Sequence, residues 1–161
     1  QACRMLLDAN IPATIFYPSN FFENLTQLQL KGNRILLAGD QTTKSWWISA
    51  GDYGRQVAES FRINSNHTGN REYSIQGPEP FSMEEAADEF IRHYSGKQLK
   101  TAKAPMWIFK LLKPFSADLD FRYHILTAIN NYDETFQSED TWKALGKPET
   151  TLAEWAEKQS L

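Results

Sequence analysis

The sequence holds a single cysteine, Cys3, and no long apolar run. One cysteine excludes an intramolecular disulfide and any zinc site built on cysteine pairs. The longest apolar runs are as short as residues 35–38, far below the ~20 residues that a membrane-spanning helix needs. No basic segment precedes an apolar one near the start of the sequence, so no signal peptide is expected. A cytoplasmic protein is the resulting expectation.

The familiar catalytic signatures are also missing. None of the six tyrosines is followed by a lysine four residues later, and the eight glycines never form Gly-x-Gly-x-x-Gly. The sequence has neither a P-loop nor a Gly-x-Ser-x-Gly turn. His67, His93 and His124 are isolated from one another, so no metal site is predicted. No catalytic residue is assigned from the sequence.

Strong charge of one sign is lacking as well. Acidic residues outnumber basic ones by 20 to 17, for a net charge of −3. This balance argues against nucleic acid or an anionic membrane as a partner. The lysines of 97–103 alternate with apolar or small residues. That pattern is typical of an edge strand protected against further pairing, rather than of a nucleic-acid patch.

What the sequence does have is aromatic residues: 5 Trp, 6 Tyr and 10 Phe. So many rings suit a large core, an apolar pocket, or both. The apolar fraction of 41% and the charged fraction of 23% are those of a globular chain. A single unit over 1–161 is expected from the length.

Strand and helix patterns alternate at the start and middle of the chain, and helices dominate the end. Strands are expected over 13–17, 35–38, 71–76 and 98–104. Helices are expected over 2–9, 21–30, 52–61, 83–94 and 119–129, with others opening at Pro105, ending at Leu145 and opening at Thr151. This order predicts an α/β fold with a helical annex.

Local signals fix several helix starts. Ser82 with Glu85, and Thr151 with Glu154, have the spacing of capping boxes. Asp52 is a candidate N-cap, because a carboxylate accepts free amide protons and suits the positive end of the helix dipole. Two of the expected helices carry a set of residues at helical spacing. In the helix over 21–30 the set is Phe21, Leu25 and Leu28, and in the helix over 52–61 it is Gly54, Val57, Ala58 and Phe61.

Two places carry candidate chemistry. The first follows the buried strand, where Asn20 offers a donor and an acceptor beside several aromatic rings. Ligands bind beyond the carboxyl ends of strands in open α/β sheets, but Ser19 or Asn20 could equally serve as a helix N-cap. The second is the apolar run 106–109 with its apolar successors. It could pack in the core, or form a pocket wall or lid.

The segment 14–25 reads Thr-Ile-Phe-Tyr-Pro-Ser-Asn-Phe-Phe-Glu-Asn-Leu. It resembles the Thr–apolar–apolar–Arg-Pro-x-x-Phe-Met-Glu-Asn-Leu segment of the NmrA-like family. These are atypical short-chain dehydrogenases/reductases of the nucleoside-diphosphate-sugar-epimerase-like superfamily. Segments 48–54, 73–87 and 150–155 resemble later motifs of that family, in the same order. The resemblance covers essentially the whole chain, and it is to the C-terminal half of such proteins.

The resemblance implies part of a Rossmann-like parallel sheet, its C-terminal strands, with a helical substrate-binding annex. The dinucleotide-binding half, with its Gly-rich loop, would precede Gln1, so we expect the chain to be part of a longer one. Residues beside the nicotinamide of NAD or NADP would be Pro18, Ser19, Asn20 and Phe21. Residues lining the substrate pocket would be Phe22, Trp46, Trp47, Trp107 and Phe109. Tyr17 stands where the family often has arginine.

The function implied is the substrate-pocket half of an NAD(P)-dependent oxidoreductase acting on a small apolar or quinone-like substrate. Without the phosphate-binding turn, this half alone is expected to be inactive. Its open sheet edge predicts self-association, or association with the missing segment. Two alternatives stay open: a non-catalytic NAD(P)-sensing protein that binds a protein partner, and a stand-alone domain that binds a small ligand.

Overall fold

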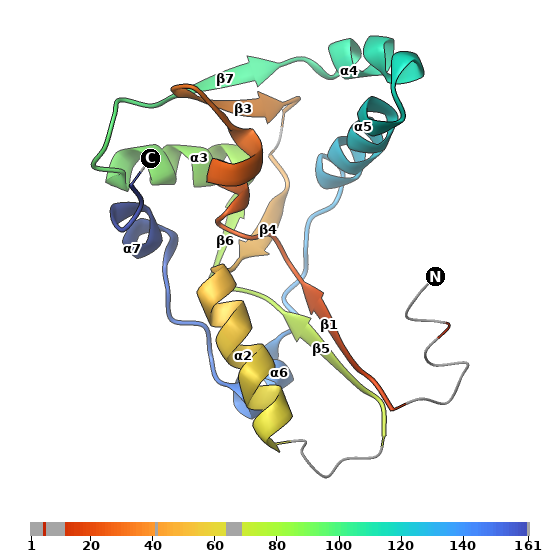
Figure 1. The fold of residues 1–161 in the computed structure, drawn as a ribbon, viewed down its shortest axis with the longest axis vertical. Coiled ribbons are helices and arrows are strands. Elements are labelled where there is room, and N and C mark those ends of the chain that lie inside the picture. The colour runs from red at the N-terminus through yellow and green to blue at the C-terminus, as the bar shows by residue number, and fades with distance from the viewer. Residues whose placement is uncertain (1–4, 6–11, 41, 64–68, 161) are drawn as a thin grey trace.

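The computed structural model describes residues 5, 12–40, 42–63 and 69–160, so the helix expected over 2–9 lies almost wholly outside the described residues. The strands are β1 (Thr14–Pro18), β2 (Leu30–Lys31), β3 (Arg34–Ala38), β4 (Lys44–Trp47), β5 (Arg71–Ile75), β6 (Glu79–Ser82) and β7 (Lys100–Ala104). The helices are η1 (Leu25–Gln29), α2 (Ala50–Ile63), α3 (Met83–His93), α4 (Met106–Leu112), η2 (Lys113–Phe115), α5 (Ala117–Ile129), α6 (Glu139–Leu145) and α7 (Leu152–Glu157). Figure 1 shows their arrangement.

The strands form three small sheets. β1 and β5 run parallel, in register from Thr14 opposite Arg71 to Pro18 opposite Ile75. A parallel pair needs a long crossover, and α2 lies in this one. β3 pairs with β2 on one side and, in parallel, with β7 on the other, while β4 and β6 are antiparallel. The predicted α/β class is confirmed, and β7 is the edge strand that the lysine pattern indicated.

The larger core lies where α3 and α7 pack together (Figure 1). Both predicted capping boxes are present: Ser82 with Glu85 starts α3, and Thr151 with Glu154 starts α7. The apolar stripe of α3 is buried as its spacing predicts, and it includes Met83, Ala86, Ala87 and Phe90. Phe90 contacts Trp155 of α7, with 5.5 Å between the ring centroids.

The helix expected over 21–30 is wrong in extent and in type. Only Leu25–Gln29 is helical, it is a π-helix, and Leu30 already belongs to β2. Leu25 is fully buried, whereas Leu28 is 62% exposed. The predicted shared face therefore does not form, because a π-helix has a wider turn than the α-helical spacing assumes.

The start of α2 also differs from the prediction. The helix begins at Ala50, so Asp52 lies inside its first turn rather than at the N-cap. The Ser49 hydroxyl accepts the Asp52 N–H at 3.0 Å, which is the capping bond. The buried face of α2 is polar and consists of Asp52, Gln56 and Ser60. Phe61, from the predicted apolar set, is 69% exposed.

Candidate functional site

The loop that follows β1, residues 18–21 (the strand-end loop), is held on two sides by backbone hydrogen bonds. The Ser19 N–H donates to the Ile75 carbonyl at the end of β5, at 2.9 Å. On the other side, the Ile48 N–H donates to the Asn20 carbonyl at 2.9 Å, and the Phe22 N–H donates back to Ile48 at 3.0 Å. The loop is thus fixed between the ends of β5 and β4, at the carboxyl ends of the parallel strands.

Two polar side chains of the strand-end loop have partners from distant segments. The Asn20 amide donates to the Ser45 hydroxyl on β4 at 2.6 Å. The Ser19 hydroxyl donates to Oε2 of Glu134 at 2.5 Å. The backbone N–H of Trp46 donates to the same oxygen at 2.8 Å. A carboxylate is therefore fixed at the strand ends, within hydrogen-bond reach of the residues that the sequence singled out.

Aromatic residues lie on the same segments as these polar side chains. Trp46 of β4 contacts Phe136 at a centroid distance of 4.7 Å, and Phe136 contacts Trp142 of α6 at the same distance. Phe21 of the strand-end loop meets Tyr53 of α2 edge to face, at 5.4 Å. Polar groups beside ring faces suit a planar, largely apolar ligand.

The structure brings only some of the predicted residues together. Trp46 lies beside the strand-end loop, but Phe22 and Trp47 are fully buried in the larger core. The Trp47 indole N–H donates to the Phe81 carbonyl at 2.9 Å, which satisfies its polar atom there. Trp107 and Phe109 belong to α4, which Figure 1 places at the upper end of the molecule, away from the end of β1. The pocket roles of these residues stay predictions.

Sequence reasoning missed Glu134, Ser45 and Phe136. Ser19 and Glu134 are 115 positions apart, and no motif surrounds Glu134 in the sequence. Its position follows from the tertiary pairing of residues 133–134 with β4, where the Glu134 N–H donates to the Lys44 carbonyl at 2.9 Å. Among the described residues, no group of three or more His, Cys, Asp or Glu side chains could hold a metal ion.

We predict that Glu134→Ala loosens the strand-end loop. The substitution leaves the Ser19 hydroxyl and the Trp46 N–H without their acceptor, a loss of about 2 kcal/mol for bonds to a charged group. Urea unfolding followed by circular dichroism measures it. Glu149→Ala is the matched control, because Glu149 is 81% exposed and its ion pair with Arg55 is long, at 3.9 Å. Equal unfolding midpoints for the two variants would contradict the assigned role of Glu134.

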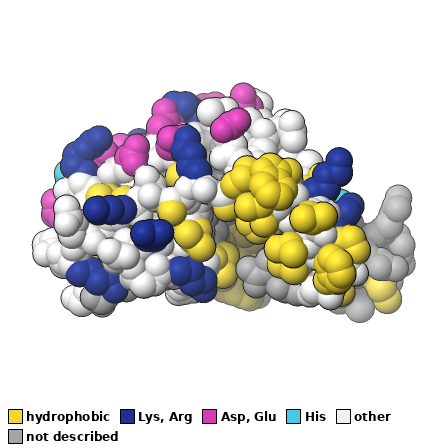
Figure 2. Space-filling model, turned by 90° about the horizontal axis from the view of Figure 1, so that it is seen from above, with side chains coloured by type: hydrophobic (Ala, Val, Ile, Leu, Met, Phe, Trp, Pro, Cys, Tyr) yellow, Lys and Arg dark blue, Asp and Glu magenta, His cyan; other side chains and the backbone are white. Residues whose placement is uncertain are grey.

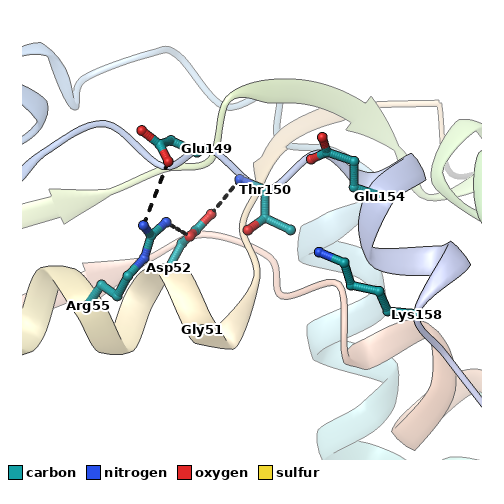
Figure 3. A pocket seen from close by; sticks show the side chains of 7 residues that line it. All are labelled: Gly51, Asp52, Arg55, Glu149, Thr150, Glu154 and Lys158. Atoms are coloured by element: carbon teal, nitrogen blue, oxygen red, sulfur yellow. Dashed lines mark hydrogen bonds and ion pairs between the residues drawn. The ribbon is translucent and has the colours of Figure 1, made fainter.

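A second group of charged residues surrounds a polar hollow of about 430 Å³ between the start of α2 and residues 149–158 (Figure 3). Asp52 is its most buried carboxylate: its Oδ2 accepts the Thr150 N–H at 2.9 Å, and its Oδ1 accepts from the Arg55 guanidinium. Arg55 also faces Glu149, as Figure 3 shows. These contacts tie α2 to the segment before α7, so Asp52 has a structural role.

The stability contribution of Asp52 should depend on pH. Burial by itself raises the pKa of Asp52, but the Thr150 N–H and the Arg55 guanidinium outweigh it and hold the pKa below its ordinary value. A carboxyl with a lowered folded-state pKa stabilises the fold fully above its unfolded pKa of about 3.9 and loses that contribution as pH falls through the folded value. Unfolding midpoints measured from pH 7 to below that pKa should fall less steeply in Asp52→Asn. An unchanged slope in that variant would contradict this assignment.

Comparison with known proteins gives the fold its class. No family model matches the sequence, and neither does any curated protein. Solved structures do match. An NADPH-dependent quinone oxidoreductase from Escherichia coli is 22% identical with a TM-score of 0.68, over 95% of this chain and 57% of that one. The triphenylmethane reductase of Citrobacter sp., complexed with NADP(H), is 16% identical with a TM-score of 0.64, over 98% and 56%.

A nucleoside-diphosphate-sugar epimerase from Staphylococcus aureus is also similar, at 18% identity and a TM-score of 0.61, over 98% of this chain and 56% of that one. The fold is therefore Rossmann-like, as in these solved structures. The chain spans about half the length of the solved structures that it matches. This coverage agrees with the resemblance to a C-terminal half that the motifs predicted.

Proposed function

We propose that this chain is the substrate-pocket half of an NAD(P)-dependent oxidoreductase of NmrA-like type. The observation that carries the proposal is the strand-end loop, whose polar side chains and neighbouring aromatic residues lie at the carboxyl ends of two parallel strands. Ligands of open α/β sheets bind at this edge. The half-length match to NAD(P)-dependent enzymes supports the same function.

In the proposed complex, Pro18, Ser19, Asn20 and Phe21 lie beside the nicotinamide, which supplies or accepts a hydride when bound. The residues of this chain fit the nicotinamide end of such a cofactor and not its phosphates. Ser19 and Asn20 are held in place by Glu134 and Ser45. The described chain contains no Gly-rich turn before a helix to bind the phosphates. The phosphate-binding residues therefore belong to the other half of the protein.

The proposed substrate is small and apolar or quinone-like. Trp46 shares the Glu134 carboxylate with Ser19 through its backbone N–H, and its ring contacts Phe136. Phe22 and Trp47 would support the pocket from the core side. Trp107 and Phe109 lie on α4, away from the strand-end loop (Figure 1), so the proposed pocket does not include them. The match to a quinone oxidoreductase supports this substrate class.

The proposed position for the dinucleotide-binding half is the free edge of β1. Within the described residues, β1 pairs with β5 along one edge only. Parallel sheets are almost always larger than two strands and covered on both faces, so an isolated parallel pair is incomplete. A further parallel strand from the other half would continue the sheet and shield this edge.

The experiment that tests the proposal is a titration of NADPH and NADH against the protein as its source makes it, after its intact mass is measured. The proposal expects a mass well above 18.5 kDa and saturable quenching of tryptophan fluorescence. It also expects oxidation of the bound cofactor by a quinone. Binding without turnover of any quinone would favour the sensing alternative. A mass of 18.5 kDa with no cofactor binding would overturn the proposal in favour of a stand-alone ligand-binding domain.

A further inference from the structure

A helical hairpin made of α4, η2 and α5 (residues 106–129, the apolar hairpin) carries large apolar side chains on its surface. Trp107 is 63% exposed and Phe115 is 81% exposed. The other exposed members of the set are Leu111, Leu112, Phe121 and Ile125. Figure 2 shows hydrophobic side chains gathered on the end of the molecule where the hairpin lies. Exposed apolar patches of this kind mark surfaces that contact another body.

The positive charge of the protein is concentrated at the same end. Residues 97–125 contain six basic and two acidic residues, whereas the rest of the chain contains eleven basic and eighteen acidic ones. Lys97, Lys100 and Lys110 form no ion pair with any residue that the structure describes. Lys113 lies over the Tyr123 ring, 4.9 Å from its centroid. In Figure 2, Lys or Arg side chains border the apolar patch on two sides.

We propose that the apolar hairpin docks on the surface of a membrane that contains anionic lipids. Tryptophan, phenylalanine and leucine enter the boundary between headgroups and acyl chains, and the flanking lysines attract anionic headgroups. Docking of this kind needs no spanning segment, and no helix among the described residues is long and apolar enough to cross a membrane. The whole-chain charge of −3 conceals this feature, because it averages the basic end with an acidic remainder.

Two other occupants fit the observations less well. A second copy would bring two basic hairpins together, and like charges in an interface are unfavourable. A dinucleotide-binding half that continues the sheet would join at the free edge of β1. Figure 1 places that edge in the lower half of the molecule, whereas α4 is at the top. A bilayer surface matches both the apolar area and the charge.

Sedimentation of the protein with vesicles tests the proposal. The vesicles are pure phosphatidylcholine, or phosphatidylcholine with about 30% phosphatidylglycerol, since anionic lipid is the variable that attracts basic segments. We expect binding to the mixed vesicles only, weakened as salt rises above about 0.1 M and the screening length shrinks. Trp107→Ser with Leu111→Ser should lower the binding constant roughly tenfold or more, because two interfacial anchors are removed. Lys100→Gln with Lys110→Gln should lower it similarly by removing two charges.

Phe61→Ser is the matched control. Phe61 is as exposed as Trp107 but belongs to α2, outside the apolar hairpin, so its loss should leave vesicle binding unchanged. Thermal melts confirm that each variant is folded. Absence of binding to the anionic vesicles overturns the proposal, as does binding that survives in both hairpin variants. A dimer in sedimentation equilibrium that only the Trp107/Leu111 variant abolishes would assign the patch to a second copy. Cofactor titration is a separate readout, so the proposed function can fail or succeed independently.

Discussion

Gly77→Ala is expected to destabilise the protein by roughly 4 kcal/mol or more, in the exceptional range for a single substitution. Gly77 follows β5 and passes directly against the end of β4. A Cβ atom at this position would lie 1.5 Å from the Trp47 carbonyl oxygen and 2.9 Å from the Ile48 Cα. Both are backbone atoms, so no side chain can rotate away. The two segments must separate, and Ile48 is the residue that holds the strand-end loop through its hydrogen bonds to Asn20 and Phe22.

Gly54→Ala is the matched control for Gly77→Ala. Gly54 lies inside α2, and a Cβ atom there meets no described atom within 4 Å beyond the adjoining residues of its own helix. Alanine in a helix interior is preferred to glycine by about 1 kcal/mol, so this variant should be slightly more stable than the parent. Thermal and urea unfolding measure both variants. If Gly77→Ala unfolds within about 1 kcal/mol of the parent, the close approach is wrong, because overpacking alone already costs about 1–3 kcal/mol.

The parts of the fold that the sequence predicts well depend on neighbouring residues. The capping box of Ser82 and Glu85 joins positions three apart, so its pattern is complete within one helical turn. The lysines of 97–103 likewise indicate an edge strand, because the charges that protect a strand edge from further pairing lie within the strand itself. Both features form as the local pattern indicates.

The features of the fold that were predicted wrongly depend on residues far apart in the sequence. The spacing in α2 favoured an apolar buried face, but Asp52 and Gln56 are buried instead. Asp52 accepts from Thr150, and the Gln56 amide donates to the Gly146 carbonyl at 2.7 Å. Helix periodicity cannot show that such partners exist. Strand β6 was also not predicted, and it contains Pro80, a residue that central strands exclude. Among the described residues β6 pairs with β4 alone, so it is an edge strand, where a proline is tolerated.

The candidate site divides in the same way. Asn20 and Ser19 follow a recognisable strand, so the general rule for α/β sheets indicates them. Glu134 and Ser45 come from segments that only the folded chain brings to that strand. A single sequence carries no signal for contacts between segments so far apart. Ser19 and Asn20 could therefore be predicted, whereas their hydrogen-bond partners could not.

Phe90→Ala is the second large effect that we expect, a loss of about 3–5 kcal/mol for a buried phenylalanine. Phe90 has no exposed surface and is the ring that joins α3 to α7. It stacks on Tyr94 at 5.5 Å with an interplanar angle of 18°, and it contacts Trp155 at 5.5 Å. Truncation removes both ring contacts and leaves a cavity between two helices, which close-packed neighbours fill only partly. The near-ultraviolet circular dichroism of Trp155 and Tyr94 should weaken together with the urea midpoint.

Phe61→Ala is the control for Phe90→Ala, because it changes helix propensity in the same way without removing a buried ring. Phe61 and Phe90 are both phenylalanines inside helices, but Phe61 is 69% exposed. Both substitutions gain the same small helix propensity, about 0.5 kcal/mol, so the difference between them isolates the packing of Phe90. Phe61→Ala should change the free energy of unfolding by no more than about 0.5 kcal/mol. Similar losses for the two variants would mean that the α3–α7 contact is not the centre of the core, or that Phe61 is covered by a further part of the protein.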